Sequence, residues 1–251
     1  MTIQVCSDLH LELKENREWF KKHPIIPKGD ILIIAGDTYF LNRNYGKLDF
    51  IKQASQDFKE VFLIPGNHEF YGGYDAAYAL YPIVKNIAPN VTLLNNTSLQ
   101  IEDYTFIFST MWSHISKQMY EVINGMIDFR NIIYKGGQFY MHHFNKLHNK
   151  SFEFISDEVE KKGKKVVVTH HLPSTQCHLP EFKGNLLSEA FCTDKTEFIS
   201  KNNIQYWIYG HSHGNQRDFE ISGTKMVTNQ FGYIHSEEHH DFNYEKTLVL
   251  T

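Results

Sequence analysis

The stretch VFLIPGNHEFYGG, residues 61–73, decides the fold and raises the question of function. Its first four residues form a short apolar run, which is typical of a buried strand. Gly66 and Asn67 follow directly, and such residues are typical of the turn that ends a strand. His68 and Glu69 come next. His68 is therefore either an ordinary turn residue or a side chain that the turn presents for chemistry.

Four other apolar runs resemble this one: residues 2–8 (TIQVCSD), 30–37 (DILIIAGD), 165–171 (KVVVTHH) and 205–213 (QYWIYGHSH). Stretches with helical spacing lie between the runs, at 46–58, 75–87 and 192–201. This alternation of strands and helices predicts an α/β fold. Residues 92–96, 97–110 and 216–251 are more typical of antiparallel strands, and Ser222 and Gly223 predict a hairpin turn within 218–228. We therefore expect mixed sheets.

Composition excludes several classes of protein. The 251 residues, 41% hydrophobic, suit one globular domain over 1–251, in which we expect 112–164 to form a helical insertion near the site. A net charge of −4 and only four arginines argue against binding to extended nucleic acid. Three cysteines do not suggest a disulfide framework. With no signal peptide or apolar span recognised, no membrane partner and a cytoplasmic location are expected.

Each of the five apolar runs ends at potential metal ligands. These are Asp8 and His10, then Asp37, then Asn67 and His68, then His170 and His171, and finally His211 and His213. Any one of them alone is more simply read as a cap, a turn residue or a core histidine. Because ligands bind beyond the carboxyl ends of strands in α/β sheets, the five ends together predict one shared site.

The residue types indicate which metals this site would hold. Nitrogen and oxygen ligands without a thiolate suit Mn, Fe or Zn. Seven candidate ligands, Asp8, His10, Asp37, Asn67, His170, His211 and His213, are too many for one tetrahedral ion and suit two divalent ions that share a carboxylate. The spacings of Asp8 with His10, and of His211 with His213, would place each pair on one side of an extended segment.

At this point the sequence resembles the calcineurin-like metallophosphoesterases. The motifs of that family, D-x-H, G-D, G-N-H-[DE], H and G-H-x-H, occur here in order as SDLH, AGDT, PGNHE, VVVTHH and YGHSH, spanning residues 8–213. The resemblance implies a four-layer α/β/β/α sandwich with two mixed β-sheets.

The resemblance also implies roles for the motif residues. Asp8, His10 and His213 would bind the first metal, and Asn67, His170 and His211 the second. Asp37 would bridge the two metals, and His68 would be catalytic without being a ligand. Gly36-Asp37-Thr38-Tyr39 departs from the G-D-x-x-Y of purple acid phosphatases, because Tyr39 stands one position early. A tyrosinate ligand is therefore not expected.

Four other residues are possible neighbours of the site. Glu69 would orient His68 or its loop, or else be an acid at a helix N-terminus. His171 would face the metals or the substrate, or pack in the core. TMWSHI (110–115), MIDFRNI (126–132) and NQFGY (229–233), together with GNHEFY, are similar to an uncharacterised bacterial branch of the family, although His114 and Gln230 depart from its acidic residue and proline. On that basis Asp128 and Arg130 would approach the site; alternatively they form a surface ion pair.

These residues suggest a hydrolytic mechanism. A hydroxide bridging the two ions would attack the phosphorus of a small phosphate mono- or diester, while His68 stabilises charge or protonates the leaving oxygen. The alternatives are a non-catalytic metal-binding scaffold on the same fold and a nuclease acting on short nucleic acid. Loops 39–46, 71–75, 112–145 and 173–190 would select the substrate. Trp112, Phe129 and Tyr140 would either stack on a base or pack in the core.

Overall fold

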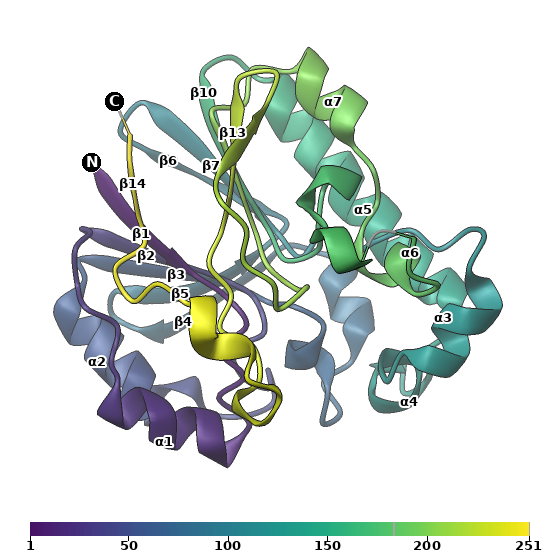
Figure 1. Cartoon of the computed structure of the whole chain (residues 1–251), viewed down its shortest axis with the longest axis horizontal. Coiled ribbons are helices and arrows are strands. Elements are labelled where there is room, and N and C mark those ends of the chain that lie inside the picture. Colours follow the sequence, from purple (N-terminus) through teal and green to yellow (C-terminus); the bar gives the residue numbers. More distant parts are fainter. Residues whose placement is uncertain (183, 251) are drawn as a thin grey trace.

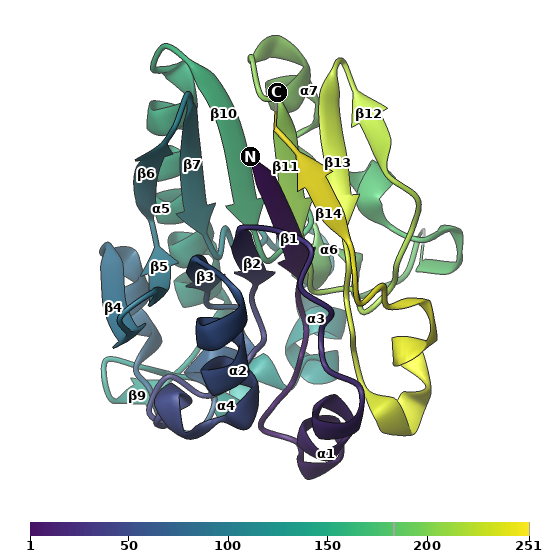
Figure 2. The same ribbon diagram turned by 90° about the vertical axis from the view of Figure 1, so that its left-hand side faces the viewer.

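A computed structural model of the chain describes residues 1–182 and 184–250. Its strands form two six-stranded sheets and one small hairpin (Figures 1 and 2). The first sheet has the order β14 (Thr247–Val249), β1 (Thr2–Cys6), β2 (Ile31–Ala35), β3 (Glu60–Ile64), β5 (Val91–Asn95) and β4 (Ile83–Ala88). The second has the order β12 (Phe219–Ile221), β13 (Thr224–Thr228), β11 (Tyr206–Tyr209), β10 (Lys164–Thr169), β7 (Tyr104–Ser109) and β6 (Thr97–Ile101). The hairpin joins β8 (Ile133–Tyr134) to β9 (Gly137–Gln138).

The two sheets share one plan. The central strands of each are parallel, and an antiparallel strand flanks them at each edge. The sheets are therefore mixed, as predicted. The hairpin predicted at Ser222 and Gly223 joins β12 to β13, and both residues have positive φ angles, 48° and 90°.

The helices are α1 (Lys14–Lys22), α2 (Asp49–Asp57), α3 (Met119–Gly125), α4 (Asp128–Asn131), α5 (Met141–Glu160), α6 (Ser188–Phe191) and α7 (Thr196–Lys201). Short 3₁₀ turns are η1 (Tyr45–Lys47), η2 (His68–Phe70), η3 (Ala76–Leu80), η4 (Thr175–Cys177), η5 (Pro180–Phe182), η6 (Ile234–Ser236) and η7 (Glu238–Asp241). No helix among the described residues combines the length and apolar character needed to cross a membrane.

Side-chain alternation along the strands builds three apolar layers. Ile31 and Ile33 of β2 pack between the sheets against Phe106 of β7. Leu32 and Ile34 point the other way, toward α1 and α2. Because successive side chains of a strand point to opposite faces, a sheet that is covered on both faces needs apolar residues at every position of its central strands.

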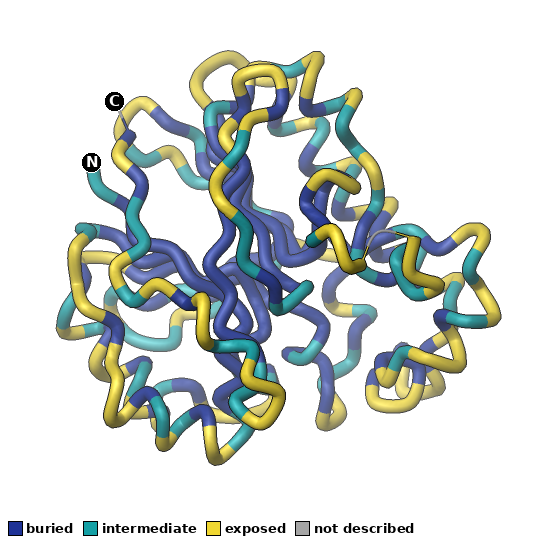
Figure 3. Tube along the Cα trace, in the orientation of Figure 1, coloured by how far each residue is buried: buried dark blue, intermediate teal, exposed yellow. Residues whose placement is uncertain are grey.

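The outer face of the second sheet is covered in the same way. Val167 of β10 packs with Ile155 of α5 and Ile199 of α7. The buried residues of α5 recur every three or four positions, which is the period of one helix face. Figure 1 shows α1 and α2 outside one sheet and α5 and α7 outside the other, and Figure 3 shows that the strands between them are buried. The architecture is the predicted α/β/β/α arrangement.

One predicted helix is wrong. Residues 75–87 form the short turn η3 and then the edge strand β4. Pro82 has no N–H to donate, and a proline disfavours helical geometry in the residue before it, so a continuous helix cannot form there. Residues 112–164 contain α3, α4, the hairpin and α5. Their status as an insertion, and the single domain, remain predictions.

Candidate metal centre

Five strands of the two sheets end at one place. The arrowheads of β1, β2 and β10 point toward the same end of the molecule in Figure 2, where the backbone turns sharply. Asp8, His10, Asp37, His211 and His213 all have φ angles between 45° and 76°. Residues other than glycine rarely adopt this left-handed region, and such residues cluster at functional sites. The chain therefore accepts backbone strain in order to direct these side chains.

This geometry shows that the ligand pairs lie together for a different reason than the extended segments expected from the sequence. Asp8 and His10 lie beyond the end of β1 at Cys6, and neither is extended. The same holds for His211 and His213 after β11. Left-handed turns, rather than the alternation of a strand, bring each pair to the site.

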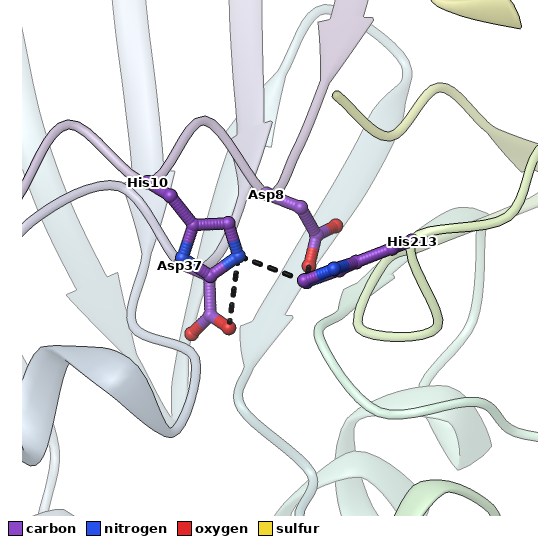
Figure 4. A group of neighbouring side chains, drawn as sticks. All are labelled: Asp8, His10, Asp37 and His213. Atoms are coloured by element: carbon purple, nitrogen blue, oxygen red, sulfur yellow. Dashed lines mark hydrogen bonds and ion pairs between the residues drawn. The ribbon is translucent and has the colours of Figure 1, made fainter. Parts of the chain in front are cut away.

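The candidate ligands form two groups that share Asp37. In the first, here called the Asp8 group, ligand atoms of Asp8, His10, Asp37 and His213 lie within 4.8 Å of one another (Figure 4). In the second, the His170 group, ligand atoms of Asp37, His170 and His211 also lie within 4.8 Å of one another. Asn67 joins this second group, because its Oδ1 lies 3.2 Å from Nε2 of His170. The structure thus brings all seven predicted ligands together.

Glycines make room for this approach. Asp37 and Asn67 each follow a glycine, Gly36 and Gly66. A Cβ at Gly66 would overlap the Asp37 carboxylate and the His170 imidazole. Gly36 has φ +94°, and a Cβ there would also overlap His170.

The tautomers in the Asp8 group favour a bound cation. Nδ1 of His10 lies 2.9 Å from Oε1 of Glu12, and Nδ1 of His213 lies 2.7 Å from Oε2 of Glu238. Because carboxylates accept hydrogen bonds, both Nδ1 atoms donate, and a neutral ring then keeps a lone pair on Nε2. The two Nε2 atoms lie only 2.9 Å apart. A divalent cation accepts both lone pairs, so these residues fit a metal ion.

Protonation is a poor alternative for His10. Burial lowers the pKa of His10, and the neighbouring His68 and His213 lower it further, against an opposing effect of Glu12. The chain itself therefore disfavours a proton on the inner nitrogen of this ring.

The His170 group is held by the backbone. Nδ1 of His170 donates to the carbonyl of Ala35 at 2.9 Å, so Nε2 faces Asn67 and, at 3.3 Å, Oδ2 of Asp37. Burial opposes a charge on His170, but Asp37, Asp8 and the Ala35 carbonyl together outweigh burial and raise the pKa to about 9. Nε2 of His211 is buried and has no hydrogen-bond partner among the described residues. These atoms also converge where a positive charge would be stabilised.

His68 lies beside the ligands. Its backbone N–H donates to Oδ1 of Asp37 at 2.9 Å, and its Nδ1 lies 2.9 Å from Oε1 of Glu12. The ring packs on Tyr71, with 4.3 Å between centroids. Burial lowers the pKa of His68, but Asp37 and Glu12 outweigh it and raise the pKa to about 9. The turn at Asn67 thus presents His68 at the edge of the ligand cluster.

Glu69 holds the loops around the site. Its carboxylate accepts from the backbone N–H groups of Asp37, Thr38 and Gly66 at 3.0, 2.7 and 2.7 Å. It therefore joins the turn after β2 to the turn after β3, rather than orienting the ring of His68.

The other predicted neighbours differ in their placement. His171 is 1% exposed, and its ring lies 4.1 Å from His211 and 5.5 Å from Trp112, in the core behind the ligands. Asp128 is buried, its carboxylate oxygens have no hydrogen-bond partner among the described residues, and its charge raises the pKa of His68. Arg130 is exposed and donates to the carbonyl of Asn124 at 2.9 Å, so the described structure contains no Asp128–Arg130 ion pair.

The aromatic residues and the cysteines are also placed. Trp112 and Phe129 are buried in the core, and Tyr140 is 49% exposed. Tyr39 packs on Phe40 and Tyr45. The three cysteines are buried free thiols, in line with the absence of a disulfide framework.

Three residues at the site were not predicted. Glu12 and Glu238 accept hydrogen bonds from ligand histidines, and the hydroxyl of Tyr233 lies 3.3 Å from Nε2 of His68. Glu12 carried a weak signal, because it follows Asp8 and His10 at the same two-residue spacing. Glu238 lies 25 residues after His213, and no spacing connects the two.

Comparison with known proteins identifies the family. An uncharacterised protein of Acanthamoeba polyphaga mimivirus, L509, is 29% identical over 273 aligned positions, which cover 96% of this chain and 94% of the relative. The crystal structure of the phosphopantetheinyl hydrolase PptH from Mycobacterium tuberculosis has the same fold, with a TM-score of 0.67 over 99% of this chain and 95% of that one, at 15% identity. The family model of calcineurin-like phosphoesterases matches residues 1–215. The chain therefore belongs to the calcineurin-like phosphoesterase family.

Proposed function

We propose that this protein is a metal-dependent phosphoesterase that hydrolyses a small phosphate mono- or diester at a centre of two divalent cations, Mn, Fe or Zn. The observation that carries the proposal is the pair of ligand groups that share Asp37. Asp8, His10 and His213 would hold one cation, and Asn67, His170 and His211 the other. Cations bound there supply neutralisation of the phosphate oxygens and a more acidic water.

The protein's own side chains supply position and proton transfer. His68 Nδ1–H donates to Glu12, which fixes the ring and leaves Nε2 beside the Tyr233 hydroxyl. A proton on Nε2 would pass to the leaving oxygen of the ester. Asp37 keeps Oδ1 on the His68 N–H, which leaves Oδ2 to the two ligand groups.

Hydrolysis of two chromogenic esters, a phosphate monoester and a diester, tests this proposal. Protein loaded with Mn²⁺ should release the chromophore from at least one of them, and chelation should abolish the reaction. The ratio of the two rates then separates a phosphomonoesterase from a phosphodiesterase. Two bound cations without turnover on either ester would favour the scaffold alternative. A short oligonucleotide measured alongside tests the nuclease alternative.

A further inference from the structure

A segment that follows the family match reaches the metal centre. The match ends at residue 215, whereas Tyr233 lies just before η6. The ring of Tyr233 lies 4.5 Å from both His10 and His213, between centroids. The segment is also fixed to the centre by Glu238, whose Oε2 accepts from the Tyr233 N–H and from Nδ1 of His213, each at 2.7 Å.

The hydroxyl of Tyr233 lies beside Nε2 of His68. It lies 3.3 Å from Nε2, while Glu12 holds Nδ1 on the other side of the ring. A phenol both donates and accepts, so this contact forms whether or not Nε2 carries a proton. A distance of 3.3 Å is long for a hydrogen bond, so this bond is weak and its loss costs little.

This edge of the Asp8 group is partly exposed. Tyr233 is half-buried, and the side chains of His68 and His213 are 16% and 14% exposed. By contrast, His10 and His170 are fully buried. Tyr233, His68 and His213 therefore form the accessible edge of the Asp8 group.

An anionic ligand would meet few positive side chains here. Among the described residues, every ion pair of Asp8, Asp37 and Glu12 is with a histidine. Arg17 donates to the Leu11 carbonyl, and Arg130 to that of Asn124. Beyond the cations and His68, few donors are therefore available to the phosphate oxygens, and the Tyr233 hydroxyl lies beside the site as one.

We propose that Tyr233 is a substrate-binding residue, whose hydroxyl donates a hydrogen bond to an oxygen of the bound phosphate group. The proposal rests on the proposed function for the identity of that group. This role gives the segment after residue 215 a part in substrate recognition.

Binding of inorganic phosphate to Mn²⁺-loaded protein tests the proposal without turnover. Tyr233→Phe keeps the ring against His10 and His213 but removes the donor. Calorimetry should give a dissociation constant for phosphate about tenfold higher than that of the wild type, as expected for a lost bond to a charged group. Metal content and the midpoint of thermal unfolding should stay at wild-type values.

Tyr244→Phe is the matched control. Tyr244 lies in the same C-terminal segment and accepts from Nε1 of Trp19 at 2.8 Å, so this variant also loses one hydrogen bond of a phenol. Its affinity for phosphate should match that of the wild type. Equal affinities of wild type and Tyr233→Phe, or a metal-loaded wild type that binds no phosphate, would overturn the proposal.

Ester hydrolysis separates this proposal from the proposed function. A wild type that hydrolyses neither ester, but loses phosphate affinity in Tyr233→Phe, would refute the esterase activity and support the binding role. Lower turnover in Tyr233→Phe with unchanged phosphate affinity would mean that Tyr233 acts by positioning His68, and would overturn the binding role.

Discussion

The two ligand groups that share Asp37 differ in what stands behind their histidines. In the Asp8 group, His10 and His213 each donate to a carboxylate, Glu12 or Glu238. In the His170 group, His170 donates to the backbone carbonyl of Ala35. Around His211 lie the rings of His171 and Phe191, at 4.1 and 4.7 Å. One group therefore has several carboxylates and is partly open, and the other has no carboxylate besides Asp37 and is buried.

This difference predicts unequal affinity for cations. Asp8, Glu12 and Glu238 place more negative charge around the Asp8 group than the His170 group has. A carboxylate behind a ligand histidine also fixes its tautomer and makes the ring a better donor. We therefore expect two separable binding steps, with the tighter one at the Asp8 group.

Removing Asp37, which both groups share, should abolish the difference in cation affinity between the groups. This substitution should have the largest effect on metal binding and turnover. Asp37→Ala takes a carboxylate from both groups, so both cations should be lost. Turnover should fall by at least about 10³-fold, because metal ions contribute several kcal/mol to such reactions. Elemental analysis of the purified variant measures the metals. Asp30→Ala is the control, since Asp30 is an exposed partner of Lys59. Two fully bound cations in Asp37→Ala would refute the bridge.

A substitution of His68 tests whether this histidine, which donates to Glu12 beside the Asp8 group, is itself a metal ligand. His68→Ala leaves every proposed ligand in place, so both cations should remain bound. Turnover should fall by roughly 10²–10⁴-fold, the usual contribution of a general acid or base. His235→Ala is the matched control, because His235 pairs with Glu15 at an exposed position. Wild-type turnover in His68→Ala would eliminate its catalytic role.

A substitution of Glu238 tests whether the carboxylate behind His213 causes the difference in cation affinity between the groups. Glu238→Gln keeps the shape of the side chain but removes the charge behind His213. The tighter binding step should weaken by about 10–100-fold, as is typical for such outer partners, and the weaker step should not change. Competition with a fluorescent chelator resolves the two steps. Glu15→Gln, an exposed carboxylate on the neighbouring α1, is the control. Equal weakening of both steps would show that the two groups do not differ in this way.

The sequence was sufficient to predict the seven side chains that the structure brings together, but not their supports. The seven could be predicted because they lie just after apolar runs, where the carboxyl ends of the strands meet. Tyr233 ends the NQFGY motif, but neither its place beside His68 nor that of Glu238 beside His213 could be predicted, because both depend on the path of the chain after β13. The error at 75–87 is of another kind, because Pro82, which disfavours a helix there, stands in the sequence itself. The left-handed turns at Asp8 and His10 were also not evident from the residues, since neither is a glycine.

Acid should lower the folding stability of the core behind the His170 group. His148 of α5 lies in the core behind the His170 group, where its Nδ1 bonds the carbonyl of Trp112 at 2.9 Å and the Trp112 ring packs on His171. Burial lowers the pKa of His148 to about 4, with further lowering by Lys195 and His114, against the Trp112 carbonyl. Between pH 6.5 and 4 the unfolded chain therefore binds a proton that the folded chain does not.

The direction of the pH effect on stability follows from this difference in bound protons. Stability should fall as the pH drops through this window, by about 2 kcal/mol at pH 5 for this one group. His148→Gln removes the titration, so its free energy of unfolding should fall less between pH 7 and pH 5 than that of the wild type. Urea denaturation of both chelator-treated proteins measures the two differences. The other histidines are common to both proteins, so their contributions cancel. An identical pH dependence in the two proteins would show that His148 titrates normally, and that the layer behind the His170 group admits a charge after all.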